Sequence, residues 1–64
     1  MIRVNGIEHG GGFDTVATML QELDIEPRGA AVAVNGEIVR RAEWTDTSLV
    51  DGDVVEIVSA AAGG

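Results

Sequence analysis

The pattern of apolar and polar residues predicts a chain of short strands interrupted by one helix. Residues 1–5 alternate apolar and polar side chains, as a strand with one buried face does. Asn5-Gly6 is a favoured pair for a tight turn, so residues 7–9 can return as a second strand. The glycine run at residues 10–12 predicts a loop, because the Lys and Ser/Thr that complete a phosphate-binding loop do not follow it.

A stripe of apolar residues at three- and four-residue spacing then predicts an amphipathic helix over roughly residues 14–24. The stripe consists of Phe13, Val16, Met19, Leu20 and Leu23. Asp14 or Thr15 can cap the start of the helix, since either side-chain oxygen can accept from an exposed amide of the first turn. Pro27 and Gly29 are expected to end the helix and to begin a turn.

The second half of the chain predicts three more strands. The third strand covers residues 30–34, and Asn35-Gly36 is again a favoured pair for a two-residue hairpin into a fourth strand at residues 37–39. The chain is then expected to leave the sheet through a short helical turn, with Trp44 closing one end of the core. Leu49 is the apolar anchor of the polar connection that follows.

The last strand is predicted at residues 53–58 and is the longest. The alternation of side chains places Val55 and Ile57 on the inner face of the sheet and Glu56 on the solvent side. Val54 and Val58 then lie on the outer face, which is unusual for a surface that contacts only water.

This order of elements predicts an α+β fold, a β-grasp. A mixed sheet of about five strands carries one main helix packed across it, and the first and last strands pair in parallel at the centre, as a helical crossover permits. Residues 1–64 are interpreted as one domain, in which residues 59–64 form an extended C-terminal tail.

The composition of the chain argues against several classes of function. Eleven acidic residues against four basic ones give a net charge of −7, a field that repels nucleic-acid phosphates and attracts a basic protein surface. The absence of cysteine excludes disulfides and thiolate zinc sites, and a single histidine excludes a His-rich metal site. No signal-peptide pattern or membrane-spanning apolar run is present, so a cytoplasmic protein without nucleic-acid or membrane partners is expected.

Catalysis by side chains is poorly supported. The chain has neither Cys nor Lys, and His9 is the one base that could activate a serine. Asp51 and Asp53 flank a turn glycine, and two carboxylates do not assemble the six-oxygen shell of a hard cation. No catalytic residue and no metal ligand is therefore assigned.

The remaining candidate is the C-terminal carboxylate of Gly64. Converted to a mixed anhydride with a nucleotide, a carboxylate can be attacked by sulfur, provided that the tail threads into the active site of another enzyme. Gly63 and Gly64 have no Cβ to collide with the walls of such a site, and Ala61 and Ala62 keep the tail slim. With no cysteine, the chain cannot carry sulfur as a persulfide.

Four segments occur together in one order. They are the hairpin of residues 34–39, Arg41-Ala42-Glu43-Trp44, residues 49–57 with their Asp-Gly-Asp turn, and the terminal Gly63-Gly64. In this combination the chain resembles the ThiS family of sulfur carriers, which have a ubiquitin-like β-grasp fold. The resemblance covers essentially the whole chain. One departure is Arg40, where the family often has a proline.

The resemblance implies a reaction cycle. An E1-like adenylyltransferase, resembling ThiF, uses ATP and magnesium to adenylate Gly64. Sulfur, drawn from cysteine by a desulfurase or from another donor, then forms a thiocarboxylate. A thiazole synthase, resembling ThiG, takes this sulfur for the thiazole ring of thiamine. The chain is thus expected to be a carrier and not an enzyme, to bind no cofactor itself, and to be a monomer when free.

Partner docking is predicted on the outer face of the sheet. The candidates are Ala31, Ala33, Ile38 and Val58, with Arg40 and Arg41 at the rim. The alternative reading is that these residues are ordinary exposed surface. The alternatives for the function are a carrier for another pathway (the small subunit of molybdopterin synthase, or a carrier for cysteine synthesis or tRNA thiolation) and a β-grasp binding module without carrier activity.

Overall fold

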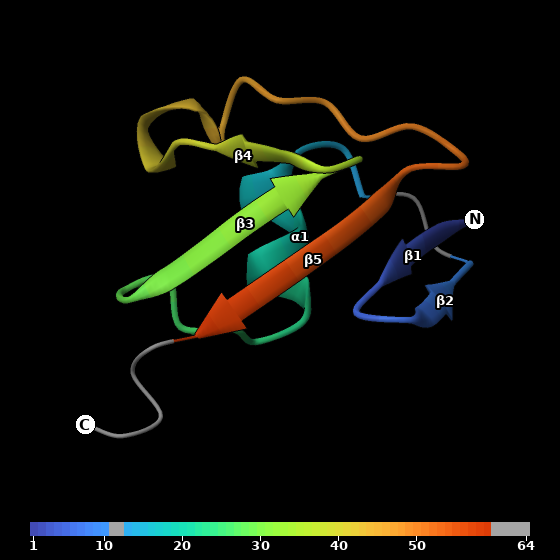
Figure 1. Ribbon diagram of the computed structural model, residues 1–64, viewed down its shortest axis with the longest axis horizontal. Helices are drawn as coiled ribbons and strands as arrows, with labels where there is room; N and C mark the ends of the chain where they lie inside the picture. The colour runs from blue at the N-terminus through green and yellow to red at the C-terminus, as the bar shows by residue number, and fades with distance from the viewer. Residues whose placement is uncertain (11–12, 60–64) are drawn as a thin grey trace.

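Five strands and one helix make up the fold in the computed structural model, which describes residues 1–10 and 13–59 (Figure 1). The strands are β1 (Ile2–Val4), β2 (Ile7–His9), β3 (Ala30–Val34), β4 (Glu37–Val39) and β5 (Val54–Ser59). Helix α1 spans Val16–Glu22, and a 3-10 turn, η1, spans Arg41–Glu43. The sheet has the order β2-β1-β5-β3-β4.

The last strand, β5, lies in the middle of the sheet. It runs parallel to β1 and antiparallel to β3 over five residue pairs. The two Asn-Gly pairs form the hairpin turns, with both asparagines at positive φ (51° and 52°). The topology confirms the predicted β-grasp, in which a helical crossover brings two parallel strands together.

Helix α1 is shorter than its apolar stripe predicted. Thr15 is the N-cap, and its hydroxyl accepts a hydrogen bond from the backbone N–H of Thr18 at 3.2 Å. Phe13 is buried, but it precedes the helix and reaches the core from the loop, so its assignment to the helical stripe was wrong.

The end of α1 also differs from the expectation. The predicted turn after Pro27 is present, and the N–H of Ala30 donates to the carbonyl of Pro27 at 3.2 Å. Pro27 and Gly29 do not end the helix, however, because its last residue is Glu22 and Leu23 is its C-cap. Asp24 follows with a φ of 58°, a left-handed conformation that reverses the chain. The N–H of Ile25 then donates to the carbonyl of Leu20 at 2.9 Å, which satisfies one of the last helical carbonyls.

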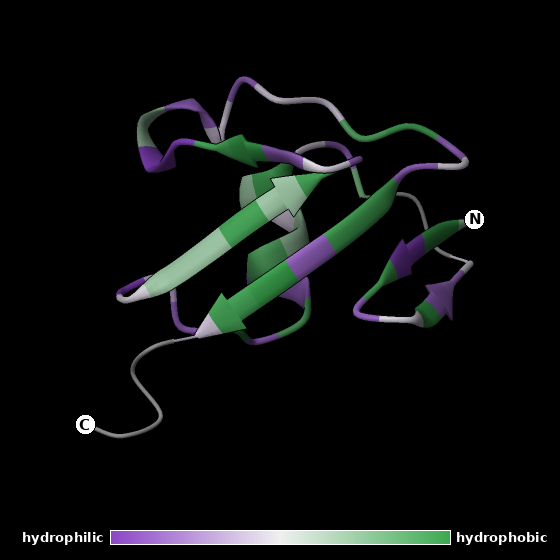
Figure 2. Cartoon of the chain, in the orientation of Figure 1, coloured by the Kyte–Doolittle hydropathy of each residue, from purple (hydrophilic) through white to green (hydrophobic). Residues whose placement is uncertain are grey.

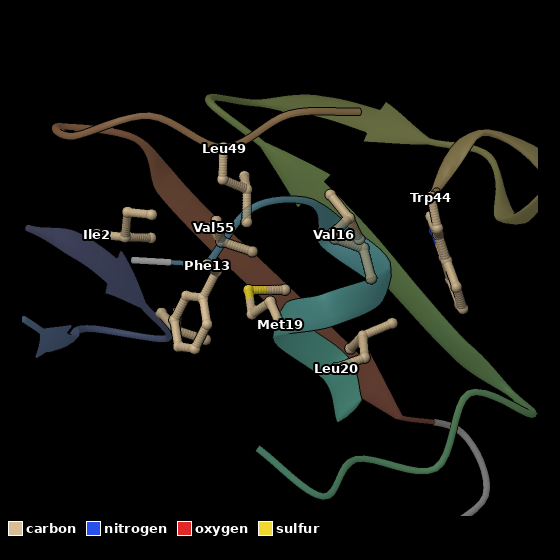
Figure 3. Packing of buried hydrophobic residues seen from close by; sticks show 10 residues of the cluster. Ile2, Phe13, Val16, Met19, Leu20, Trp44, Leu49 and Val55 are labelled. Atoms are coloured by element: carbon tan, nitrogen blue, oxygen red, sulfur yellow. The ribbon is translucent and has the colours of Figure 1, made fainter. Parts of the chain in front are cut away.

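The core lies between α1 and the inner face of the sheet (Figure 3). Met19, Val16, Val32 and Val55 are fully buried at its centre. Trp44 closes one end of the core, as predicted, and its indole N–H donates to the carbonyl of Val39 at 3.0 Å. Because this bond satisfies the one polar atom of the indole, the ring can be buried without an unpaired donor.

The opposite face of the sheet is left open. In Figure 1 helix α1 lies behind the sheet, so no helix of the described residues covers the side of β3 and β5 that faces the viewer. Val55 is fully buried, whereas Val54 and Val58 are 42% and 66% exposed. This confirms the predicted division of β5 into an inner and an outer face, and it positions the candidate site.

Candidate functional site

The outer face of the sheet brings the predicted docking residues together. Ala31 pairs with Val58, and Ala33 pairs with Ile38 on one side and with Glu56 on the other. Directly paired residues point to the same side of a sheet. The side chains of these residues, Glu56 included, therefore share one face. We call Ala31, Ala33, Ile38, Val54 and Val58 the outer-face patch.

The patch exposes large apolar side chains in spite of the small size of the chain. Ile38 is 73% exposed and Val58 is 66% exposed, and Val54 adds to them from the start of β5. Figure 2 shows that most residues of β3 and β5 are hydrophobic, counting both faces of the sheet. Large exposed aliphatic side chains that share one face of a sheet favour a surface that contacts another protein.

Two arginines stand at the β4 end of the face. Arg40 and Arg41 are both exposed, and neither belongs to the two ion pairs found among residues 1–10 and 13–59. The backbone of Arg40 has φ −66° and ψ 147°, a conformation that proline adopts without strain. A proline would therefore fit the backbone at this position, and Arg40 places a positive charge there.

Both hairpin asparagines also hold β5 through their side chains. The amide of Asn35 accepts from the N–H of Val54 at 2.9 Å and donates to the carboxylate of Asp53 at 3.0 Å. On the other side of the strand, Asn5 accepts from the N–H of Ile57 at 2.8 Å and donates to its carbonyl at 3.2 Å. The pairing of β1 with β5 ends at Val55, so Asn5 continues the hydrogen bonding where β1 stops.

These contacts make β5 a firmly held base for the residues that follow it. Ser59, its last residue, still pairs with Ala30 of β3. Four of the predicted site residues come next in the chain, namely Ala61, Ala62, Gly63 and Gly64, and they lie outside the described residues. The pair formed by Ala31 and Val58, the last before that of Ser59, places the outer-face patch beside the point where β5 ends.

His9, the candidate base, contacts an aromatic ring in the structure. The ring of His9 packs against that of Phe13, with centroids 5.8 Å apart. No hydrogen bond joins His9 to a serine in the part of the chain that the structure describes. In the same residues, no group of three or more His, Asp and Glu side chains could hold a metal ion.

A shallow groove lies on the other side of the molecule, beside α1. Its lining includes Ala17, Leu20, Ile25 and Trp44, and the one ionisable residue among those that line it is Asp14. A single carboxylate does not supply an acid–base pair. Within residues 1–10 and 13–59, no helix is long and apolar enough to cross a bilayer.

Two features of the site were not predicted from the sequence. The hydrogen bonds of Asn5 and Asn35 to β5 were missed, because an Asn-Gly pair indicates a turn but not what the side chain will contact. Glu56 was recognised as a residue on the solvent side, but not as the charged neighbour of the docking residues. Glu56 is two residues from Val54 and two residues from Val58. This spacing puts all three side chains on one face of a strand, and it was the signal that could have placed Glu56 there.

Comparisons with known proteins bear directly on this site. The chain matches the model of the ThiS family over residues 3–64, so the diglycine falls within the family pattern. It is 38% identical to the sulfur carrier protein ThiS of Thermus thermophilus over 64 residues, which covers all of both chains. It is 40% identical to the sulfur carrier protein ThiS of Escherichia coli over 50 residues, or 78% of this chain and 76% of that protein.

Two further similarities concern a thiazole synthase and a solved structure. A thiazole synthase of Paramagnetospirillum magneticum is 40% identical over 62 residues, which cover 95% of this chain and 19% of that protein. The crystal structure of a thiamine biosynthesis protein (ThiS) from Geobacter metallireducens superposes with a TM-score of 0.80 at 30% identity, over 98% of this chain and 97% of that chain. By sequence and by fold, the chain belongs to the ThiS family.

Proposed function

We propose that this chain is a sulfur carrier protein of thiamine biosynthesis, in which the C-terminal carboxylate of Gly64 carries the sulfur. The observation that carries the proposal is the match to the ThiS family, which runs to residue 64 and includes Gly63-Gly64. Two relatives at 38% and 40% identity bear the name of sulfur carrier protein ThiS. The chain itself has no cysteine on which sulfur could travel as a persulfide.

The first step is adenylation by an E1-like enzyme. A carboxylate oxygen of Gly64 attacks the α-phosphorus of ATP, and pyrophosphate leaves, so the terminus becomes an acyl adenylate. Magnesium and ATP are bound by that enzyme, and magnesium suits this role because it binds phosphates while keeping several waters. The carrier contributes its terminus and the surface by which it is held.

The second step replaces the nucleotide by sulfur. Hydrosulfide attacks the acyl carbon of Gly64 directly, and AMP leaves with the bonding electron pair. When a cysteine desulfurase is the donor, its persulfide attacks the same carbon, and a thiol then reduces the resulting acyl disulfide, forming a new disulfide with the donor sulfur and leaving the outer sulfur on Gly64. The product is a thiocarboxylate. A thiazole synthase then takes the sulfur, and the similarity of nearly the whole chain to 19% of one thiazole synthase supports this partner.

Docking uses the outer-face patch. The patch is exposed and lies beside the end of β5, so a partner that covers it is well placed to receive the residues after Ser59. Arg40 and Arg41 lie at the rim, where they can meet acidic groups of the partner. The role of the fold is recognition, while the chemistry occurs in the partner.

Exchange of radioactive pyrophosphate into ATP tests the first step. The E1-like adenylyltransferase of the same organism should catalyse this exchange only when the chain is present, because the acyl adenylate forms reversibly. A variant that lacks Gly64 should not support exchange, and urea denaturation should show that the variant is still folded. Exchange at the same rate with that folded variant would contradict the proposal.

A further inference from the structure

Glu56 is a single carboxylate in the middle of the outer-face patch. It lies on β5 between Val54 and Val58, and its direct neighbour on β3 is Ala33. It is the one charged residue of β5 and corresponds to the hydrophilic band across that strand in Figure 2. The patch is therefore not uniformly apolar, and any surface that covers it also covers a negative charge.

Residues 1–10 and 13–59 provide no counter-ion for the carboxylate of Glu56. Arg3 is the nearby cation on β1, where it pairs with Val54 across the strands. Its guanidinium donates to Glu8 at 2.9 Å instead. Among the residues that the structure describes, no hydrogen bond or ion pair of the Glu56 side chain is found.

Covering an unpaired carboxylate with an apolar surface is strongly unfavourable, because the charge loses its hydration and gains nothing in return. A partner that binds the outer-face patch must therefore compensate the charge of Glu56, and a cation does so most completely. A partner that does not compensate it is rejected, since it would leave the charge buried and alone. In this way Glu56 can select among surfaces that would otherwise satisfy the same apolar patch.

We propose that Glu56 determines the specificity of docking and that the partner presents an arginine or lysine at the centre of its otherwise apolar contact surface. The inference rests on the proposed carrier function and adds the chemistry of the surface that the carrier recognises. The partner cation sits over Glu56. Val54 and Val58 each lie two residues along the strand from Glu56, one in each direction, at a distance of about 7 Å. The aliphatic stem of the partner cation lies across Ala31 and Ala33, whose small side chains leave room for it.

The net charge of the chain agrees with such a partner. At −7, the chain is attracted to a basic surface over a distance comparable to the Debye length. That attraction is not specific, because it comes from all of the acidic residues together. Glu56 is different, since it is the acidic residue that lies within the apolar patch, where contact removes water and the pair becomes directional.

The test compares Glu56→Gln and Glu56→Arg with the original chain in the pyrophosphate exchange assay. Glu37→Gln is the matched control, because Glu37 is an exposed glutamate on the edge strand β4 that points away from the outer-face patch. The KM for the carrier should rise about thirtyfold for Glu56→Gln, which leaves the partner cation unpaired, and further for Glu56→Arg, which repels it. The kcat should stay unchanged, and Glu37→Gln should behave as the original chain.

Three outcomes would overturn the proposal. One is a KM for folded Glu56→Gln within twofold of the original while the original chain is active; this result would leave the carrier function standing. Another is the absence of exchange with the original chain, which would remove the carrier function and this inference together. The third is a dimer of the original chain in sedimentation that dissociates in Glu56→Arg, since the patch would then be covered by a second copy.

Discussion

The side-chain amide of Asn5 forms two hydrogen bonds with the backbone of Ile57, 52 residues further along the chain. The chain turns away from β5 at Asn5-Gly6, so no further residue of β1 can pair with β5. The side-chain amide of Asn5 makes the hydrogen bonds that the backbone of such a residue would make. One side chain thus ends the first hairpin and holds the central strand two residues before its end at Ser59. The base of the C-terminal tail is held by this contact as well as by the pairing with β3.

Replacing Asn5 by glycine should therefore destabilise the fold. Glycine adopts the left-handed conformation of Asn5 (φ 51°) without strain, so the change removes the two side-chain hydrogen bonds and leaves the turn possible. We expect the free energy of unfolding to fall by about 1–2 kcal/mol, as for two solvent-exposed hydrogen bonds. Urea denaturation, followed by the fluorescence of Trp44, measures this loss.

Asp24→Gly is the matched control for that experiment. Asp24 has nearly the same backbone conformation, with a φ of 58°, and its side chain makes no hydrogen bond in the part of the chain that the structure describes. Its replacement should change the free energy of unfolding by less than about 0.5 kcal/mol. Equal losses in the two variants would mean that glycine itself, and not the missing amide, destabilises the chain.

Arg40→Pro should be tolerated and should stabilise the fold. The φ of −66° at Arg40 equals the value that the proline ring imposes, and Val39 before it is in the extended conformation that proline favours in its predecessor. The N–H of Arg40 donates no hydrogen bond in the described part of the chain. The expected gain is about 0.4–1 kcal/mol, because proline restricts the unfolded chain.

Arg40→Ala separates this backbone effect from the loss of charge. The alanine variant should unfold at about the same urea concentration as the original chain, while the proline variant unfolds at a higher one. If both variants shift together, the change in stability comes from removing the arginine side chain. If the proline variant is the less stable of the two, the backbone assignment at Arg40 is wrong.

The inner and outer faces of the sheet should respond very differently to truncation. Met19 is fully buried against the inner face, so Met19→Ala should lower the free energy of unfolding by about 2–5 kcal/mol. Ile38 is 73% exposed, so Ile38→Ala should change it by less than about 0.5 kcal/mol. A large loss in Ile38→Ala would show that the outer-face patch supports the fold, and its role in docking would lose its main argument.

The alternation of side chains was sufficient to predict which face of β5 is buried. Val55 and Val58 lie three residues apart, which in a strand places them on opposite faces, and the structure has them so. To place the docking residues on the outer face, one more fact was needed, namely the register of β3 against β5. A slip of one residue would have moved Ala31 and Ala33 to the inner face, and no local pattern sets that register.

Other features depend on contacts between residues far apart in the sequence. Phe13 has the spacing of a helical residue, but Thr15 caps the helix two residues later, so that Phe13 enters the core from a loop. The bond between Asn5 and Ile57 has no signal in either segment alone. Gly64 was singled out by its chemistry, because a bare terminus in a chain without cysteine leaves few other groups to carry sulfur.

The most direct test of the carrier function is the intact mass of the chain after incubation with the adenylyltransferase, ATP, magnesium and a sulfur source. The account predicts a mass increase equal to the exchange of one oxygen for one sulfur, located at Gly64 by fragmentation and absent in the variant that lacks Gly64. An unchanged mass, under conditions in which the same enzymes convert another carrier, would contradict it.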